Sequence, residues 1–248
     1  MCEICNIPEA LMLLEKKHSR VMLDPYQVSG QTSLIFAPKR CVAAIKDLTH
    51  EENDELFEAV HYTAAETEQE LSCEDLIIFI NQGELAGQTT PHLHVQMIFF
   101  QEKNAGYRNF QLDQALFTKI SKSASEKIKL AESLTMGVPL VFKLEEKWPG
   151  FRIGSDREIS SFTGLDSTEI HHIFEFIRES LAITWDNINP DGLNIIISQG
   201  RLDGCQKTQA DVKVVFRFAG DNIENFSRPD KLKNPASQEM IKLMRAVI

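Results

Sequence analysis

An internal repeat constrains the fold of this chain more than any other feature of its sequence. Adding 117 to the positions of residues 78–99 gives residues 195–216, and eight of the 22 compared positions are identical. Chance alone supplies roughly one or two identities over such a stretch. The identical pairs are Ile78/Ile195, Ile80/Ile197, Gln82/Gln199, Gly83/Gly200, Leu85/Leu202, Gly87/Gly204, Val95/Val212 and Phe99/Phe216. We therefore expect the 248 residues to fold as two copies of one unit rather than as one long domain.

The same offset also joins two segments that have the apolar spacing of amphipathic helices. It pairs Leu48 with Leu165 and Phe57 with Phe174 inside these segments. In the first copy we expect the helix over residues 49–71, where a Thr N-cap is followed three residues later by Glu. The strands expected in this copy are residues 32–38, 75–81 and 92–101.

The second copy is expected to repeat this order of elements. Its helix is predicted from about residue 167 to 185, and its strands near residues 138–144, 193–198 and 210–218. Helical spacing also predicts a connecting helix over residues 113–134 and a terminal helix over residues 237–247. The expected division of the chain is a first unit at residues 1–105, a connecting helix within residues 106–136 and a second unit at residues 137–248.

The glycine-rich stretch that begins at Asn81 carries the clearest chemical signal. It reads Asn-Gln-Gly-Glu-Leu-Ala-Gly-Gln-Thr-Thr-Pro-His-Leu-His-Val-Gln-Met-Ile over residues 81–98. Because side chains on a strand alternate between faces, His92, His94 and Gln96 are expected on one face and the apolar residues between them on the other. Glycine lets the backbone approach a ligand closely, so the N–H groups of this turn can hold an anion such as phosphate.

This stretch resembles the histidine-triad (HIT) superfamily, whose members carry an Asn, then Ala-Gly-Gln, then His-x-His-x-His or His-x-His-x-Gln at this spacing. The Gln ending, here Gln96, is found in the galactose-1-phosphate uridylyltransferase and dinucleoside-tetraphosphate phosphorylase branches. In those branches two units lie in one chain. The resemblance therefore implies an α+β fold in which two HIT-like units in tandem form a pseudo-dimer with a mainly antiparallel sheet.

The resemblance also implies a nucleotidyl-histidine mechanism. The middle residue of the motif, here His94, is the nucleophile, and attack on an α-phosphorus gives a phosphoramidate that a second acceptor cleaves. His92 and Gln96 flank the phosphoryl group. Because an amide can donate a hydrogen bond but cannot transfer a proton, Gln96 indicates a leaving group, such as a phosphate or sugar phosphate, that departs without protonation.

These features favour a nucleotidyltransferase or nucleotide phosphorylase that acts on a nucleotide sugar or a dinucleoside polyphosphate. Two alternatives stay open. One is a hydrolase of dinucleoside polyphosphates or nucleotides, and the other is a nucleotide-binding regulatory protein with little turnover. A protein that only binds nucleotides has no need of a second imidazole at the nucleophile position, so His94 is the residue that separates the last alternative from an enzyme.

Five further residues match the substrate-binding positions of the family. Asn81 and Thr89 resemble its phosphate-contacting residues, and Asp24 resembles its ribose-binding acid. An ordinary Asp-Pro turn is the alternative for Asp24. Gly87 and Gln88 belong to the predicted phosphate turn, where Gln88 is better explained as a turn residue than as a ligand contact.

The N-terminal Cys2-x-x-Cys5 has the spacing of half a zinc site. Members of the family complete such a site with a His after a Pro-Lys turn and with the first His of the motif. In this chain the turn reads Pro-Lys-Arg-Cys41, so Cys41 takes the place of that His. The resemblance implies structural zinc held by Cys2, Cys5, Cys41 and His92, a donor set that suits the metal. His50 is a spare ligand, although a place at a helix N-terminus is the plainer interpretation.

The two copies are chemically unequal. At the 117-residue offset, the His-x-His-x-Gln positions of the first copy correspond to Gln209, Asp211 and Lys213. An acid thus takes the place of the nucleophile, so we expect the second copy to be degenerate and to serve a structural or substrate-specifying role.

Composition excludes several other classes of protein. The formal net charge of −10 argues against nucleic acid as a partner, since such proteins usually present a basic face. Five scattered Cys do not make a disulfide framework. The chain has no apolar run near the ~20 residues of a membrane span and no N-terminal signal pattern. We expect a cytoplasmic protein with a nucleotide or nucleotide-sugar substrate, either a monomeric pseudo-dimer or a homodimer.

Overall fold

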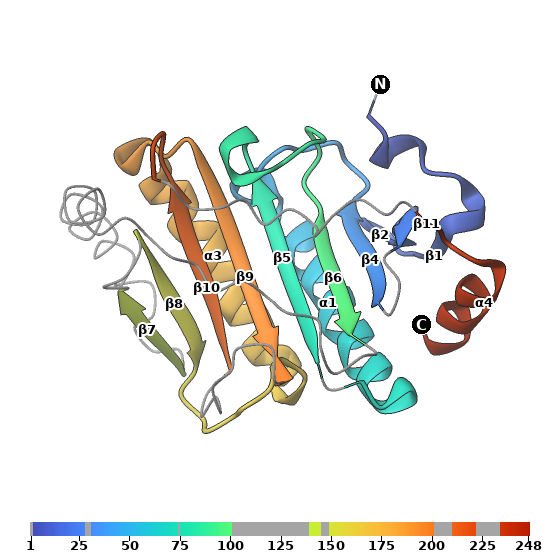
Figure 1. The fold of residues 1–248 in the computed structure, drawn as a ribbon. Helices are drawn as coiled ribbons and strands as arrows, with labels where there is room; N and C mark the ends of the chain where they lie inside the picture. The colour runs from blue at the N-terminus through green and yellow to red at the C-terminus, as the bar shows by residue number, and fades with distance from the viewer. Residues whose placement is uncertain are drawn as a thin grey trace.

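Nearly all described strands join one antiparallel sheet. Figure 1 shows the computed structural model, which describes residues 2–27, 31–73, 75–100, 139–144, 149–200, 210–221 and 234–248. Within these residues a nine-stranded sheet has the order β1-β2-β4-β6-β5-β9-β10-β8-β7. Its strands are β1 (Met12–Glu15), β2 (Ser19–Leu23), β4 (Gln31–Pro38), β5 (Leu76–Gln82), β6 (Val95–Phe100), β7 (Leu140–Leu144), β8 (Gly150–Ser155), β9 (Gly192–Gln199) and β10 (Asp211–Arg217). A separate pair joins β3 (Tyr26–Gln27) to β11 (Asn234–Pro235).

A pseudo-two-fold axis passes between β5 and β9 at the middle of this sheet. The two strands pair antiparallel, and Phe79 lies opposite Ile196, the residue 117 positions further along the chain. Moving outward from the axis, β6, β4 and β2 on one side correspond to β10, β8 and β7 on the other. The α+β pseudo-dimer expected from the repeat is confirmed, since the register of β5 on β9 and the sequence offset describe the same symmetry.

The two long helices obey the same offset and lie side by side on one face of the sheet (Figure 1). α1 spans His50–Leu71 and α3 spans Ser167–Ile188, 22 residues each. Each begins with a capping box, made by Thr49 and Glu52 in α1 and by its counterparts 117 residues later in α3. The local sequence therefore fixes where both helices begin.

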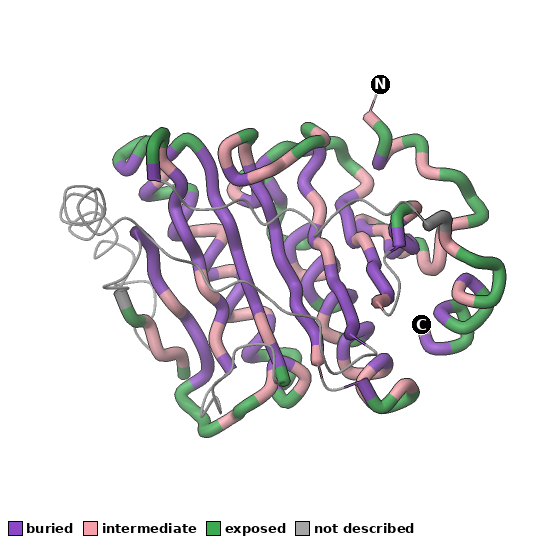
Figure 2. Tube along the Cα trace, in the orientation of Figure 1, coloured by how far each residue is buried: buried purple, intermediate pink, exposed green. Residues whose placement is uncertain are grey.

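The main core lies between these helices and the sheet. Phe57 of α1 stacks on its repeat equivalent Phe174 of α3, with ring centroids 3.6 Å apart and planes 6° from parallel. Figure 2 shows that the central strands are buried along most of their length. Alternate residues of β6, such as Val95 and Met97, point into this core. Gln96 between them therefore lies on the opposite face, away from the helices.

An arginine–glutamate pair braces each helix start. Arg40 donates to both carboxylate oxygens of Glu52, at 2.8 and 2.6 Å, and Arg157 does the same to Glu169. Both acids are buried, and the two pairs are related by the 117-residue offset. The Arg157 guanidinium, followed by the Ser155 hydroxyl and the Asp166 backbone, lowers the pKa of Glu169 to about 2 despite burial. The repeat thus extends to buried polar contacts.

The end of the chain packs on the first unit. The predicted terminal helix is confirmed as α4 (Gln238–Val247), with Ser237 as its N-cap. Arg245 donates to the carbonyl groups of Ala10 and Met12 at 3.3 and 3.1 Å, and β11 pairs with β3. The last described residues therefore close over the edge of the first unit, although they follow the second unit in sequence.

Several predicted boundaries shift. β6 begins at Val95 rather than at residue 92, so the two histidines precede the strand. β1, β2, β3, β8 and β11 were not predicted. The connecting helix predicted within residues 106–136 lies outside the described residues. Among the described helices, none is long and apolar enough to cross a lipid bilayer.

The outer strands explain why the sequence repeat fades there. Ser19 pairs with Pro38 in the first unit, and Leu140 pairs with Ser155 in the second. Pro38 and Ser155 keep the offset of 117, but Ser19 and Leu140 differ by 121. The chain between the paired outer strands is therefore four residues shorter in the second unit, and an ungapped comparison misses the equivalence of β2 and β7.

Candidate active site and metal cluster

The glycine turn between β5 and β6 is shaped by residues that tolerate a positive φ. Gly83 and Gly87 have φ of +85° and +90°, in the region that favours glycine. A Cβ on Gly83 would also lie 2.8 Å from the Asp191 carbonyl oxygen. The Gln88 side chain accepts a hydrogen bond from the Gly83 N–H at 2.7 Å, so Gln88 serves the turn itself. Thr89 is exposed beyond it.

His94 is held in one orientation by the backbone before β6. Its Nδ1 lies 2.9 Å from the His92 carbonyl oxygen, which can only accept, so Nδ1 carries the proton and Nε2 carries the lone pair. Burial lowers the pKa of His94, against the opposing effects of that carbonyl and of the Asp24 carboxylate. A neutral imidazole with a fixed Nε2 lone pair can act as a nucleophile near neutral pH.

Gln96 is hydrogen-bonded to Asp24, the residue that follows β2. Its amide nitrogen donates to Asp24 Oδ2 at 2.7 Å and to Ser33 Oγ at 3.2 Å. Asp24 is 3% exposed, and its other oxygen accepts from the Tyr26 N–H at 2.8 Å. Asp24 thus makes the turn contact that the Asp-Pro alternative predicts and also contacts the motif. Because the amide nitrogen donates to Asp24, the carbonyl oxygen of Gln96 is oriented the other way.

Asn81 is supported from the second unit. Its Oδ1 accepts from Asn194 Nδ2 at 2.8 Å, and the same nitrogen donates to the Ala86 carbonyl at 3.0 Å. Arg217 donates to Asn194 Oδ1 at 2.8 Å and to Asp221 at 2.7 Å. All four side chains of this chain of contacts are buried, and Arg217 is 1% exposed. A strand of the second unit therefore positions the predicted phosphate-contacting Asn81 and the glycine turn.

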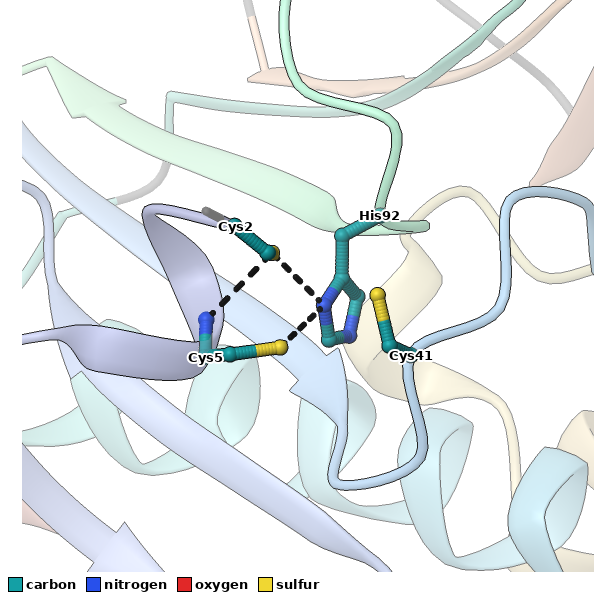
Figure 3. A group of neighbouring side chains, drawn as sticks. All are labelled: Cys2, Cys5, Cys41 and His92. Carbon is teal, nitrogen blue, oxygen red and sulfur yellow. Dashed lines mark hydrogen bonds between the residues drawn. The ribbon is translucent and has the colours of Figure 1, made fainter.

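Four predicted metal ligands come together at the N-terminus (Figure 3). The ligand atoms of Cys2, Cys5, Cys41 and His92 all lie within 4.8 Å of one another. Cys2 Sγ and Cys5 Sγ are each 3.3 Å from His92 Nδ1. His92 Nε2 lies 2.9 Å from the Pro38 carbonyl, which fixes the proton on Nε2 and leaves the Nδ1 lone pair facing the thiols.

The thiols of this cluster influence one another's ionisation. The pKa of Cys5 is raised to about 11, by its contact with Cys2, by burial and by Cys41. Burial opposes ionisation of Cys2, but the N–H of Cys5 and neighbouring groups outweigh it and lower the pKa of Cys2. One thiolate thus disfavours the next, and a bound divalent cation would reverse this because it favours every deprotonated thiol. The donor set and its second-sphere carbonyl fit a structural zinc ion.

Comparisons with known proteins relate part of this sequence to a family. The family model of the HIT domain matches residues 8–100, the stretch that holds the turn, His94 and Gln96. Residues 8–100 are therefore similar in sequence to the HIT domain. The nitrilase and fragile histidine triad fusion protein NitFhit of Caenorhabditis elegans is 31% identical over 93 residues, which are 38% of this chain and 21% of that protein. The bis(5'-adenosyl)-triphosphatase of Dictyostelium discoideum is 32% identical over 65 residues, 26% of this chain and 44% of that protein. The chain spans less than half of either relative.

Two solved structures share the fold across both units. An ADP-glucose phosphorylase from Arabidopsis thaliana has a TM-score of 0.60 and 15% identity, over 92% of this chain and 82% of that chain. A uridylyltransferase mutant has a TM-score of 0.61 and 12% identity, over 100% of this chain and 91% of that chain. At these identities the likeness shows the fold alone. The shared fold covers both units of this chain, beyond the residues that match the HIT domain model.

The structure separates two roles that the sequence analysis predicted for His92. His92 was expected both to flank the phosphoryl group and to bind metal. Its side chain is fully buried, with one ring nitrogen on the thiols and the other on a carbonyl. His94 and Gln96 are half-buried, and both lie near Asp24.

The sequence analysis did not predict four polar residues that support the candidate active site. They are Ser33, Asn194, Arg217 and Asp221. One signal could have indicated the second of these, because Asn194 is the single amide inside the apolar run of β9 before its final residues. Arg217 and Asp221 are only four residues apart, but the contacts of Ser33 with Gln96 and of Arg217 with Asn194 join residues far apart in sequence and need the strand register to be found.

The second unit lacks the same chemistry at the corresponding place. Asp211 occupies the position equivalent to His94, and its Oδ2 lies 3.3 Å from Arg152 Nη1. Gly150 occupies the position equivalent to Ser33, and a Cβ there would lie 1.9 Å from the Val214 carbonyl oxygen. The second unit therefore has no room for a hydroxyl at this position. The degenerate character expected from Asp211 and Lys213 matches this geometry.

Proposed function

We propose that the chain is a nucleotidyltransferase or nucleotide phosphorylase that works through a nucleotidyl-histidine on His94. The observation that carries this proposal is the His94 ring, whose Nδ1–H is bound to the His92 carbonyl so that Nε2 is left as the nucleophilic atom. His94 lies near Asp24, the acid that Gln96 contacts, and follows the glycine turn that can hold a phosphate.

The reaction is a double displacement at the α-phosphorus of the substrate. His94 Nε2 forms a bond to phosphorus, and the bond to the bridging oxygen breaks, so that the leaving phosphate or sugar phosphate departs with the electron pair. An acceptor then attacks the same phosphorus and the N–P bond breaks, which returns the neutral imidazole. The turn N–H groups and Asn81 stabilise the charge on the phosphoryl oxygens.

Gln96 favours transfer over hydrolysis of a poor leaving group. Its N–H is directed at Asp24, so it orients that acid and its own carbonyl, and it supplies no proton to a departing oxygen. The proposed substrates therefore carry a leaving group that is already acidic, as a nucleotide sugar or a dinucleoside polyphosphate does. Asp24 is proposed to bind the ribose of the nucleotide.

A hydrolase is the second candidate function. The relatives identified by sequence include a bis(5'-adenosyl)-triphosphatase, which matches 26% of this chain. The fold neighbours include an ADP-glucose phosphorylase and a uridylyltransferase. The two candidates share His94 and differ in the acceptor, which is water in one case and phosphate or a sugar phosphate in the other.

We also propose a structural zinc ion at Cys2, Cys5, Cys41 and His92. It would join the N-terminus to the segment before β6 and so hold the His92 carbonyl that orients His94. These four residues would bind the ion and orient His94, and the reaction itself needs only His94 and its neighbours.

The test is to follow product formation from UDP-glucose, ADP-glucose and diadenosine tetraphosphate, with and without inorganic phosphate. We expect turnover that requires phosphate or a sugar phosphate, and loss of about 10³-fold or more in His94→Ala. Asp211→Ala, the equivalent position of the second unit, is the matched control and should retain activity. Turnover in water alone would favour the hydrolase, and undiminished activity of His94→Ala would refute the mechanism.

A further inference from the structure

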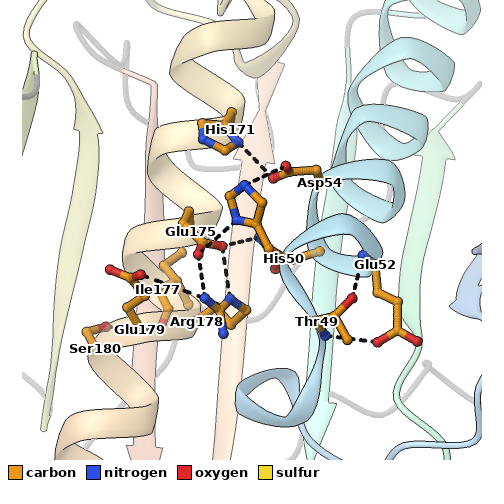
Figure 4. A network of polar contacts seen from close by, with 11 residues as sticks. Thr49, His50, Glu52, Asp54, His171, Glu175, Ile177, Arg178, Glu179 and Ser180 are labelled. Atoms are coloured by element: carbon orange, nitrogen blue, oxygen red, sulfur yellow. Dashed lines mark hydrogen bonds and ion pairs between the residues drawn. The ribbon is translucent and has the colours of Figure 1, made fainter.

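A second group of metal-ligating side chains lies on the helical face of the sheet, away from the HIT motif. His50 and Asp54 of α1 and His171 of α3 offer ligand atoms that all lie within 4.8 Å of one another. Figure 4 shows the three side chains pointing toward one another across the contact between the two helices. Each is half-buried or exposed, so an ion in solution can reach them.

The protons of this cluster are too few for its contacts if the histidines are neutral. Asp54 Oδ1 lies 2.7 Å from His171 Nδ1, and its Oδ2 lies 3.4 Å from His50 Nε2. His50 Nδ1 in turn lies 3.1 Å from Glu175 Oε1. Both nitrogens of His50 therefore face carboxylates, whereas a neutral imidazole has one N–H. One of the two contacts therefore calls for a cation at His50, either a second N–H proton or a metal ion.

Glu175 can act as the second-sphere partner of a metal-bound His50. Arg178 holds the Glu175 carboxylate, and Glu175 can accept the Nδ1–H of His50. A carboxylate behind the non-ligating nitrogen is the usual second-sphere partner of a metal-bound histidine, because it fixes the tautomer and raises ligand basicity. His50 Nε2 is then free of its proton and points at Asp54, as a metal ligand would.

A cavity adjoins the cluster on one side. It has a volume of about 210 Å³, and Asp54 and His171 line it together with Glu58, His61 and Ser167. The repeat explains it, because these last three residues are the equivalents of Glu175, Arg178 and His50. The pseudo-symmetric copy of the polar network is missing there, since Ser167 is too short to fill the place of an imidazole. The cavity leaves room for a water molecule on an ion bound by the cluster.

We propose that His50, Asp54 and His171 bind a zinc ion that links α1 to α3 across the pseudo-two-fold axis. Two imidazoles and one carboxylate are a common protein donor set for zinc, which leaves a fourth position for water on the cavity side. Asp54 and His171 are repeat equivalents of each other, so a site of this kind needs both units in one chain with unlike residues at the same position. The ion would stabilise the helix pair and not the chemistry of His94.

The test measures bound zinc in the full-length protein by equilibrium dialysis and elemental analysis. We expect His50→Ala and His171→Ala each to bind about one zinc ion fewer per chain than the wild type. His172→Ala, the adjacent histidine outside the cluster, should keep the wild-type number. Cobalt(II) substitution adds an independent readout, because the helix site should lack the thiolate charge-transfer band of the cysteine cluster.

Zinc should also raise the melting temperature of Cys5→Ser, in which the cysteine cluster is broken, and this rise should vanish in Cys5→Ser/His171→Ala. Equal zinc content in the wild type, His50→Ala and His171→Ala would overturn the proposal. So would loss of the ion in His172→Ala together with the other two variants, because that result would assign it to non-specific histidine binding.

Discussion

The first half of the sheet presents His94 and Gln96 at the positions where the second half presents Asp211 and Lys213. Within the described residues, the central strands follow the same order in both halves, and the two long helices have the same length and equivalent capping boxes. The contacts that set the backbone, the capping boxes and the arginine–glutamate pairs, lie at the starts of the helices. Gln96, which belongs to the proposed active site, lies on the other face of the sheet. The separation explains how one half can lose the chemistry without losing the fold.

The second half nevertheless contributes to the site of the first. Asn194 reaches across the junction of β5 and β9 to Asn81 and to the turn carbonyl of Ala86. Arg217 and Asp221 hold Asn194 in place. The second unit thus supports the glycine turn of the first unit in addition to covering the edge of its sheet.

Removing Arg217 should have the largest effect on stability. Arg217→Met leaves the buried Asp221 carboxylate without its cationic partner, and breaking such a pair costs about 3–5 kcal/mol. Chemical denaturation would measure this loss.

Asn194→Ala tests the functional link with a milder change and should lower kcat/KM by roughly 10-fold, about 1.4 kcal/mol, through Asn81. Asn187→Ala, an exposed Asn of the same unit, is the control, and equal activity in both variants would show that the second unit does not support the site.

Much of the fold was predictable, and the cross-unit contacts show where prediction stopped. The caps of α1 and the 117-residue offset are local or periodic signals, so they predicted the helices and the pairing of two units. The cysteine cluster followed from a motif and a family resemblance. The contact of Arg217 with Asn194 depends on the register of β10 against β9, and the sequence holds no periodic trace of it. The offset of 121 between β2 and β7 was hidden by the four-residue difference in the connection.

Disrupting the cysteine cluster should have the next largest effect, and it should fall on the first unit alone. Cys5→Ser removes one thiolate ligand, and loss of a zinc ion present at 100 to 1,000 times its Kd removes about 3–4 kcal/mol of stability. Zinc content and melting temperature should fall together. Cys73→Ser, a buried thiol outside the cluster, should keep its zinc. An unchanged zinc content in Cys5→Ser would show that the cysteine cluster does not bind zinc.

The two arginine–glutamate pairs should give the smallest and most nearly equal effects. Arg40→Ala and Arg157→Ala each leave a buried carboxylate without its charged donor, which costs about 1–3 kcal/mol. If the two variants have unfolding free energies within about 1 kcal/mol of each other, the equivalence of the two halves is supported. A large loss in one variant alone would break it.

The same pairs also predict a dependence of stability on pH. The Arg157 contact lowers the pKa of Glu169 to about 2, and the Arg40 contact lowers the pKa of Glu52. A carboxyl whose folded pKa is depressed contributes stability above its unfolded pKa, and that contribution is lost as the pH falls from there through the folded value. Between about pH 4.5 and 2 the wild type should therefore lose more stability than Arg157→Ala does. Parallel acid denaturation curves would contradict this cause of the shift.

The most direct measurement of the central claim is the stoichiometry and position of the covalent adduct. Protein mixed with a nucleotide-sugar or dinucleoside polyphosphate substrate, in the absence of acceptor, is denatured under alkaline conditions that preserve a phosphoramidate and analysed by intact mass and peptide mapping. The structure predicts about one nucleotidyl group per chain, located on His94, an unchanged adduct in Asp211→Ala and no adduct in His94→Ala. Two groups per chain, or one group that persists in His94→Ala, would contradict the account of one active and one degenerate unit.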